Sequence, residues 1–260
     1  MERWGMRGWY SRGTAIIDPG LFVPEDWESP KSGVVVFVKR VYDWMRAAVG
    51  EVELERRGGL LGARSFFATE DGLGVFHSYF GSPAAVALVE VLIAGRIREL
   101  VILGEAGAIS PDIRLGGVLV PTFAVREEGT SYHYLPPDAP AKPSEEVKGK
   151  IKGLLEEEGI PYKEGGVWTT DAVFRETRDK VVRYSSQGVL AVEMECSALF
   201  SVAEYRGVEA GALLIITDEL HGRRWREAFN DPEVVEKERR VSELLAKNWP
   251  RWSDTPLRHD

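Results

Sequence analysis

Residues 191–200 of the chain, AVEMECSALF, place two carboxylates and a thioether close together in an apolar run. Glu193 and Glu195 lie where a predicted strand passes into a predicted helix, and their carboxylates can accept hydrogen bonds from adjacent hydroxyl groups. Met194, between them, offers an apolar floor. This pattern suits a ribose. The alternative is that the carboxylates only begin a helix, whose dipole favours negative charge at that end.

Another acidic residue, Asp218, follows an apolar run in the segment LLIITDEL. Partial burial there should raise the pKa of its carboxyl group, which would make Asp218 a general acid. A purine that leaves a ribose needs a proton on a ring nitrogen, and a neutral carboxylic acid can supply that proton. The alternative is that Asp218 caps the element that follows it.

The elements that must position these residues alternate short β-branched runs with longer amphipathic stretches. This alternation predicts an α/β fold, a three-layer α/β/α arrangement around a mixed, twisted sheet. Ligands of such sheets bind beyond the carboxyl ends of the strands. Strands are predicted within 33–38, 73–83, 99–109, 116–129, 165–171, 189–194 and 210–220, and helices within 39–50, 83–96, 145–159, 173–188, 195–207 and 231–249. The segment 99–109 is expected to end in a turn at its small residues.

Length and charge indicate the class of protein. A chain of 260 residues, 44% of them hydrophobic, fits a single domain over 1–260, with an N-terminal extension at 1–32 and a C-terminal tail at 248–260. The net charge of −8 argues against nucleic-acid or anionic-membrane partners, since both need clustered Lys and Arg. The chain has few Asn and Gln residues and 28% charged residues, a composition that resembles that of proteins from thermophiles.

Several sites and signals are not expected. The N-terminus lacks the apolar core of a secretory signal and no stretch reaches the ~18 apolar residues of a membrane span, so a cytoplasmic location is expected. The single cysteine, Cys196, excludes an internal disulfide and is expected to be buried and inert. The four histidines are isolated, so no metal site is expected, and His133 should pack or lie at an interface.

The sequence lacks the motifs of dinucleotide-binding, P-loop and serine-hydrolase proteins. Three of its segments instead resemble a known family. These are residues 191–220, the segment VWTTDAVFRETRD at 167–179, and residues 111–137. They resemble the nucleoside phosphorylase superfamily, which includes hexameric purine nucleoside phosphorylases, uridine phosphorylases and methylthioadenosine nucleosidases. The resemblance implies the fold already predicted from the pattern, and no metal or organic cofactor, with inorganic phosphate as co-substrate.

The resemblance also implies roles for particular residues. Met194 and Glu195 match the ribose contacts of the family, with Glu193 in support. Asp218 matches the residue that contacts N7 in the purine-specific branch. Val173 and Phe174 fall in the segment that walls the base, where the family's stacking phenylalanine aligns with Val173. The glutamine and arginine that read uracil in uridine phosphorylases have no match here, which favours a purine.

The departures from the family pattern concern phosphate. Arg40 is kept in the VVFVKR segment, but the glycine and aspartate of the family's turn are missing. A second phosphate arginine aligns with Ile102, and the phosphate-binding threonine, beside Gly104, aligns with Glu105. A third arginine, usually donated by a neighbouring subunit, has its nearest counterparts in Arg56 and Arg57. A carboxylate beside a phosphate dianion is unfavourable, by about 4 kcal/mol for each pair of unit charges at 4 Å and an effective dielectric constant of 20.

These observations predict a nucleoside phosphorylase that releases a purine base and ribose 1-phosphate. The alternatives are a uridine-type phosphorylase, a nucleosidase in which water attacks and Glu105 orients it, and a nucleoside-binding relative without turnover. Arg40 favours the first, because it begins a helix, where an anion is favoured. The implied assembly is a homodimer or homohexamer, with residues 129–137 as a predicted interface.

Overall fold

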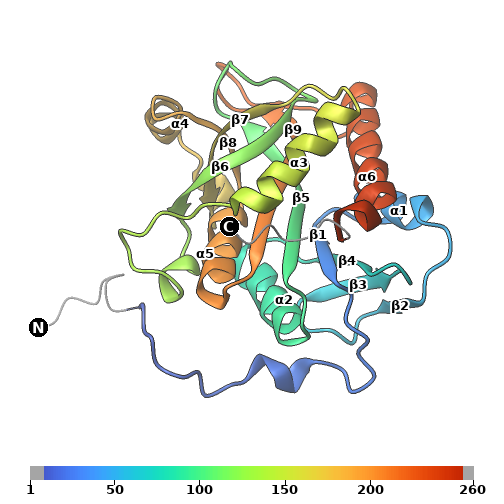
Figure 1. Cartoon of the computed structure of the whole chain (residues 1–260). Helices are drawn as coiled ribbons and strands as arrows, with labels where there is room; N and C mark the ends of the chain where they lie inside the picture. Colours follow the sequence, from blue (N-terminus) through green and yellow to red (C-terminus); the bar gives the residue numbers. More distant parts are fainter. Residues whose placement is uncertain (1–8, 254–260) are drawn as a thin grey trace, which may run out of the picture.

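The computed structural model describes residues 9–253 of the 260-residue chain, with side chains described as far as residue 248. Figure 1 shows a central sheet with helices packed around it. The strands are β1 (Ser32–Val36), β2 (Leu54–Arg57), β3 (Ala63–Ala68), β4 (Leu73–Ser78), β5 (Glu99–Ala108), β6 (Val118–Glu127), β7 (Lys163–Thr170), β8 (Val189–Glu193), β9 (Glu209–Glu219) and β10 (Arg226–Glu227). The helices are α1 (Lys39–Ala48), α2 (Ser82–Ala94), α3 (Glu145–Glu157), α4 (Arg178–Ser185), α5 (Cys196–Arg206) and α6 (Pro232–Ser253).

The strands form one mixed sheet in the order β10-β9-β6-β7-β8-β5-β1-β4-β3-β2. Strand β9 also pairs in parallel with β5 along nearly its whole length, from Glu209 opposite Glu99 to Glu219 opposite Ala108. This extra pairing closes β5, β8, β7, β6 and β9 into a ring, as in a small barrel, while β1, β4, β3 and β2 continue as an open sheet. The predicted mixed α/β fold is confirmed.

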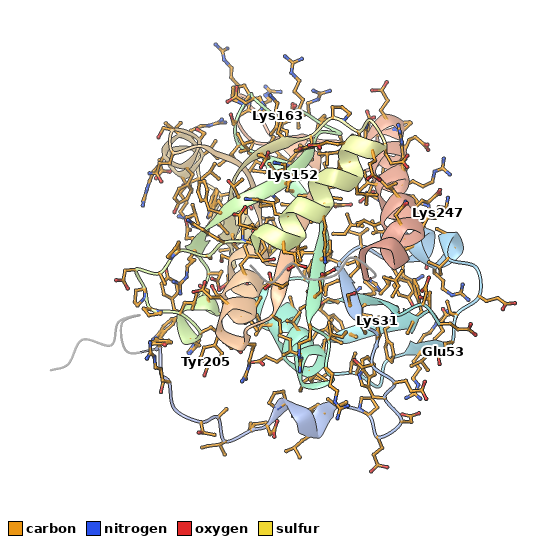
Figure 2. The ribbon with its side chains drawn as sticks, viewed as in Figure 1. Lys31, Glu53, Lys152, Lys163, Tyr205 and Lys247 are labelled. Carbon is orange, nitrogen blue, oxygen red and sulfur yellow. The ribbon has the colours of Figure 1, made fainter. Side chains whose placement is uncertain are left out.

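Helices cover the sheet on two sides, and an apolar core lies between each pair of layers. Helices α2 and α5 pack on one core, with Leu88 and Phe200 among its fully buried side chains. Helices α1, α3 and α6 pack on the other, through Met45, Ile151 and Leu245. The outer helix faces are charged: Lys247 of α6, labelled in Figure 2, pairs with Glu243 one turn earlier on the same helix.

Some strands were missed, and three of the predicted boundaries differ from those of the structure. Strands β2 and β3 were not predicted, because their short segments are flanked by glycines and resemble a loop. Strand β5 does not end in the predicted turn at its small residues but continues through them to Ala108, because it pairs with β9 and β8 on its two edges. The segment predicted as one helix at 173–188 begins as a short 3-10 turn, and α4 starts only at Arg178. Helix α6 runs past the predicted tail boundary to Ser253.

The N-terminal extension lies along the outside of the fold up to Ser32, with a short 3-10 turn at Pro19–Phe22. Trp9 stacks on His133 with ring centroids 5.2 Å apart, but His133 is otherwise exposed, so its place in a packed region or at an interface stays a prediction. Cys196 is buried, as expected, and burial raises the pKa of its thiol. Residues 1–8 of the predicted extension and 254–260 of the predicted tail lie outside the described residues. Within the described part of the chain, each helix is too short or too polar to cross a membrane.

Candidate active site

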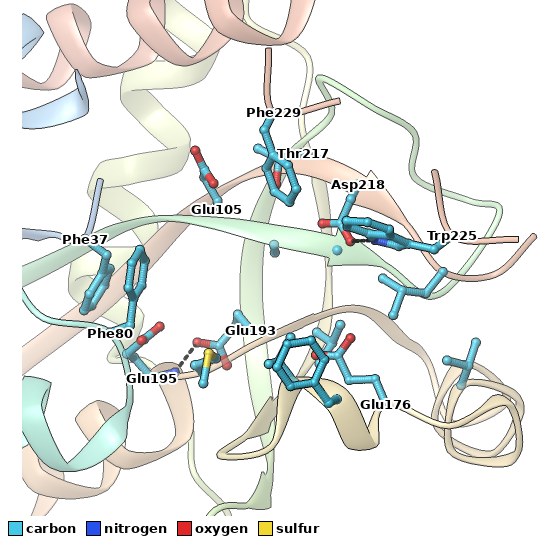
Figure 3. A pocket seen from close by; sticks show the side chains of 18 of the residues that line it. Phe37, Phe80, Glu105, Glu176, Glu193, Glu195, Thr217, Asp218, Trp225 and Phe229 are labelled. Atoms are coloured by element: carbon cyan, nitrogen blue, oxygen red, sulfur yellow. Dashed lines mark hydrogen bonds between the residues drawn. The ribbon is translucent and has the colours of Figure 1, made fainter. Parts of the chain in front are cut away.

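A cavity of about 710 Å³ opens beyond the ends of strands β5, β8 and β9. Figure 3 shows the side chains that line it. The predicted ribose residues Glu193, Met194 and Glu195 line this cavity together with Asp218 of β9. The topology therefore brings together two motifs that lie more than twenty positions apart in the sequence, at the edge of the sheet where ligands bind in α/β folds.

Glu193 and Glu195 differ in what their carboxylates contact. Glu193 Oε2 accepts hydrogen bonds from the main-chain N–H groups of Glu195 and Cys196, both at 2.7 Å, and its Oε1 accepts one from the hydroxyl of Thr169. Glu193 therefore caps the start of α5, as the alternative interpretation of this pair proposed, and its oxygens are occupied. Among the residues that the structure describes, Glu195 accepts one hydrogen bond, from the main-chain N–H of Gly81 to Oε1 at 2.6 Å. Its second oxygen is available to a ligand.

The loop that follows β4 holds Glu195 and Met194 in place. Gly81 has φ of +94°, a conformation that glycine adopts without strain, and its N–H points at Glu195. The next residue, Ser82, donates its hydroxyl to the carbonyl oxygen of Met194 at 2.7 Å. Two loops from distant parts of the chain are thus joined at the floor of the cavity. Burial, followed by the charge of Glu193, raises the pKa of Glu195 to about 8.

Asp218 faces the cavity from the end of β9, on the opposite side from the two glutamates (Figure 3). Its Oδ2 accepts a hydrogen bond from the indole N–H of Trp225 at 2.7 Å. Burial raises the pKa of Asp218, and the hydrogen bond from Trp225 acts in the opposite direction. Gly107 of β5 leaves room for this carboxyl group, because a Cβ at that position would lie 2.9 Å from Asp218 Oδ2 and 2.4 Å from Leu220.

The predicted base segment lies at the mouth of the cavity. Val173 and Phe174 both line the cavity, from the 3-10 turn that precedes α4. The side chain of Phe174 is 96% exposed, so this ring forms the rim rather than the interior. Trp225 and Phe229 face the cavity from the segment after β9, and their rings lie 6.1 Å apart.

The predicted phosphate residue Glu105 lines the cavity, and Arg40 stands behind it. The Arg40 guanidinium donates to Glu105 Oε1 through Nη2 and to Glu238 Oε2 through Nε, both at 2.7 Å. Glu238, on α6, is 2% exposed. Burial, followed by the hydrogen bond and charge of Glu238, raises the pKa of Glu105 to about 8. One guanidinium thus faces two carboxyl groups.

The other residues predicted for phosphate lie away from the cavity. Gly104 faces the core, where a Cβ would meet Leu214 at 3.3 Å. Ile102 is buried at 2% exposure in the same strand. Arg57 is exposed on β2, the far edge strand of the sheet, and Arg56 beside it forms an ion pair with Asp26. A role for Arg57 in the cavity of a second copy stays a prediction.

The cavity is strongly acidic. Within the described part of the chain its lining includes the carboxyl groups of Glu105, Glu176, Glu193, Glu195 and Asp218, and Arg178 is the only cationic residue that lines it. Arg178 donates to main-chain carbonyl oxygens of the loop after β9, including Leu220 and Arg223, both at 3.2 Å. Among residues 9–253, no cluster of three or more His, Cys, Asp or Glu side chains is arranged to hold a metal ion.

The sequence patterns did not identify several lining residues. Trp225 and Phe229 stand in a polar segment with no regular spacing, so no periodic pattern marks them. Glu176 falls within the predicted helix 173–188, and its place in the cavity was not predicted. Phe80, which precedes Gly81, carried a detectable signal, because the sequence FGSP joins a glycine to a proline-initiated helix. That turn was predicted, but its contact with Glu195 was not.

Comparison with known proteins places these features in a family. Residues 57–247 match the family described as the phosphorylase superfamily. A guanosine phosphorylase of Halorubrum lacusprofundi is 30% identical over 172 residues, which cover 65% of this chain and 71% of that protein. A uridine phosphorylase of Treponema pallidum is 31% identical over 56% of this chain and 61% of its own length. A DeoD-type purine nucleoside phosphorylase of Bacillus cereus is 30% identical over 62% and 66%.

Solved structures share the fold. The purine nucleoside phosphorylase of Toxoplasma gondii, in complex with immucillin-H, superposes with a TM-score of 0.73 at 17% identity and covers 86% of this chain and 92% of its own. The AMP nucleosidase of Bacteroides thetaiotaomicron superposes with a TM-score of 0.69 at 24% identity, over 86% and 90%. With the family match over 57–247, the chain belongs to the phosphorylase superfamily and to the same class of enzymes as these nucleoside phosphorylases.

Proposed function

We propose that this protein cleaves the N-glycosidic bond of a purine ribonucleoside and transfers the ribosyl group to inorganic phosphate. The observation that carries this proposal is the pairing, across one cavity, of Glu195 with an unoccupied carboxylate oxygen and Asp218 with a raised pKa. The names of the relatives cover guanosine, uridine and purine nucleosides. The preference for a purine therefore rests on Asp218.

The two carboxyl groups have separate tasks in this mechanism. Glu195 accepts hydrogen bonds from the 2′- and 3′-hydroxyl groups, and its charge stabilises the positive ribose that forms as the bond breaks. Burial raises the pKa of Asp218, which favours the protonated form that a general acid needs, and Asp218 donates that proton to N7 of the leaving purine. Glu193 acts through Glu195, since its hydrogen bonds to the start of α5 fix the strand-to-helix turn. Met194 supports the sugar ring.

Hydrolysis is the second candidate, and the pairing of Arg40 favours it. Both Glu105 and Glu238 accept from Arg40, so its charge is already balanced where the resemblance implies phosphate. A charged Glu105 repels a phosphate dianion, by about 4 kcal/mol for each pair of unit charges at 4 Å and an effective dielectric constant of 20. A protonated Glu105 removes this repulsion and can donate a hydrogen bond to phosphate, as a threonine hydroxyl would. A deprotonated Glu105 can instead take a proton from water.

Phosphate and water, the two possible acceptors of the ribosyl group, predict opposite responses of the reaction rate to pH and to substitution of Glu105. As pH rises through about 8, where Glu105 loses its proton, phosphorolysis should slow through repulsion and hydrolysis should speed up through base catalysis. E105T should lower the KM for phosphate if phosphate is the acceptor. Base release from inosine and guanosine, measured with and without phosphate, checks this, and E105Q is the control because it removes the titration but keeps the shape.

Those measurements also test the proposed function itself. Release that needs phosphate supports phosphorolysis, and release that ignores phosphate supports hydrolysis. Tight nucleoside binding without any release would leave a binding protein and overturn both candidates. Uridine cleaved faster than any purine nucleoside would refute the assignment of Asp218.

Substitution of Trp225 should shift the pH profile without removing activity. The indole N–H stabilises the charged form of Asp218 and so opposes the rise in its pKa. W225F removes that donor and keeps an aromatic ring, so the pKa of Asp218 should rise further. Activity that depends on protonated Asp218 should then persist to higher pH. A profile of kcat against pH that is identical in the two proteins would show that Trp225 leaves Asp218 when substrate binds.

A further inference from the structure

Glu238 is a buried carboxyl group behind the cavity, and the proposed mechanism gives it no task. It lies on α6, its side chain is 2% exposed, and it does not line the cavity. Arg40 of α1 donates through Nε to Glu238 and through Nη2 to Glu105, both at 2.7 Å. Glu105 does line the cavity, across from Glu195 (Figure 3). The three linked side chains therefore lead from the cavity wall to the contact between α1 and α6.

One guanidinium cannot balance two carboxylates that are largely out of contact with water. If both acids were ionised, a net negative charge would be buried, which is costly. A single proton held between the two carboxyl groups removes that excess charge. Oε1 of Glu238 offers a place for it, because this oxygen is buried and, among the side chains that the structure describes, has no hydrogen-bond partner. A protonated Glu105 would supply the missing donor.

The groups that act on Glu105 agree with this proton count. They are Arg40 of α1, Glu238 of α6 and Asp218 of β9. Burial comes first among the causes that raise the pKa of Glu105 to about 8, and Glu238 follows through its hydrogen bond and its charge. Asp218 acts in the same direction, and Arg40 alone of the three favours the charged form. Glu105 therefore holds the shared proton at neutral pH.

The position of the remaining negative charge decides what a phosphate dianion meets. Arg40 and one carboxylate sum to zero, whichever of the two acids holds the proton. With the proton on Glu105, the negative charge lies on Glu238, behind Arg40, and the cavity wall is neutral. With Glu105 ionised instead, the negative charge lies on the wall itself and repels the dianion.

We propose that Glu238 is a positioning residue for the phosphate co-substrate, which holds the charge of Arg40 away from the cavity and leaves a proton on Glu105. This inference rests on the proposed function for the identity of the acceptor, and it deepens that function. It gives a physical reason why a carboxyl group can stand where the family resemblance implies a threonine. Glu238 acts through Arg40 and Glu105 and does not itself touch the dianion.

The test measures the binding of a dianion to the full chain and needs no turnover. Sulfate is the probe, because it stays a dianion near neutral pH, where phosphate itself titrates. E238Q removes the charge and keeps the shape, so Glu105 becomes the only carboxylate partner of Arg40 and ionises at lower pH. Above pH 8, a fall of one pH unit in the pKa of Glu105 should weaken sulfate binding about 10-fold in titration calorimetry.

The same substitution in an E105T background should act in the opposite direction. Without Glu105 there is no shared proton, and Glu238 only neutralises Arg40, so E105T/E238Q should bind sulfate more tightly than E105T does. A side chain that served folding alone would weaken binding in both backgrounds. E236Q is the control, because Glu236 is exposed on the same helix, where it pairs with Arg239, and its substitution should change neither affinity.

The outcomes separate this inference from the proposed function. Tighter sulfate binding by E238Q in both backgrounds, or equal weakening in both, would overturn the inference. So would failure of sulfate to bind to any of these proteins. The expected reversal, found together with base release that ignores phosphate, supports the inference about Glu238 and refutes phosphorolysis. Base release that needs phosphate, without the reversal, supports the proposed function and overturns the inference.

Discussion

D218A should release guanine from guanosine roughly 10²- to 10⁴-fold more slowly than the unaltered protein, the range expected when a general acid is lost. Asp218 is half-buried at the end of β9, and burial raises the pKa of its carboxyl group, which favours the proton that a general acid must donate. Without that proton the purine must leave as an anion. The measurement is kcat for base release at saturating nucleoside and phosphate.

A substrate that needs no proton supplies the control for D218A. The base of 7-methylguanosine already carries a positive charge at the imidazole ring and leaves as a neutral molecule. D218A should therefore lose much less activity on 7-methylguanosine than on guanosine. D218N provides the matched variant, because its amide can donate a hydrogen bond to N7 but cannot transfer a proton. Equal losses on the two substrates would mean that Asp218 serves folding or binding rather than proton transfer.

The sequence predicted those parts of the fold that depend on strong local patterns. The apolar strand β9 and the amphipathic helices α1 and α3 were located because burial, period and capping residues agree, as when Ser144 accepts from the N–H of Val147 to begin α3. The continuation of β5 through its small residues was not predicted. The glycines there suggest a turn, but Gly107 instead leaves room for the side chain of Asp218. Pairing on both edges overrides the local preference.

The candidate site divides in the same way. Glu193, Met194, Glu195 and Asp218 could be chosen from the sequence because each stands where an apolar strand ends. The hydrogen-bond partners of their carboxylate oxygens could not be predicted from the sequence. Glu193 and Glu195 are two residues apart and look equivalent, yet one caps α5 and the other faces the cavity with an oxygen to spare. The same holds for Arg40, whose partner Glu238 lies 198 positions away.

E195A should lower kcat/KM for ribonucleosides roughly 10²- to 10⁴-fold, if the two hydroxyl groups each make a charge-assisted hydrogen bond of about 1.5–3 kcal/mol. E195Q is the variant that protects the fold, because its amide oxygen can still accept from Gly81. It lacks the charge that stabilises the ribosyl cation, so its loss should appear mainly in kcat.

The control for Glu195 is a nucleoside without its hydroxyl groups. The unaltered protein should discriminate strongly against a 2′,3′-dideoxynucleoside, and E195A should not, because the two changes remove the same interaction.

Binding of a ribonucleoside should also release a proton. The pKa of Glu195 is raised to about 8 in the empty cavity, and donors from the ribose favour the charged form and lower that pKa, so at neutral pH the carboxyl group gives up its proton. Calorimetry in buffers of different ionisation enthalpy measures this release. Loss of activity in E195A that is equal for the ribose and dideoxyribose substrates, with no proton released, would place the sugar elsewhere.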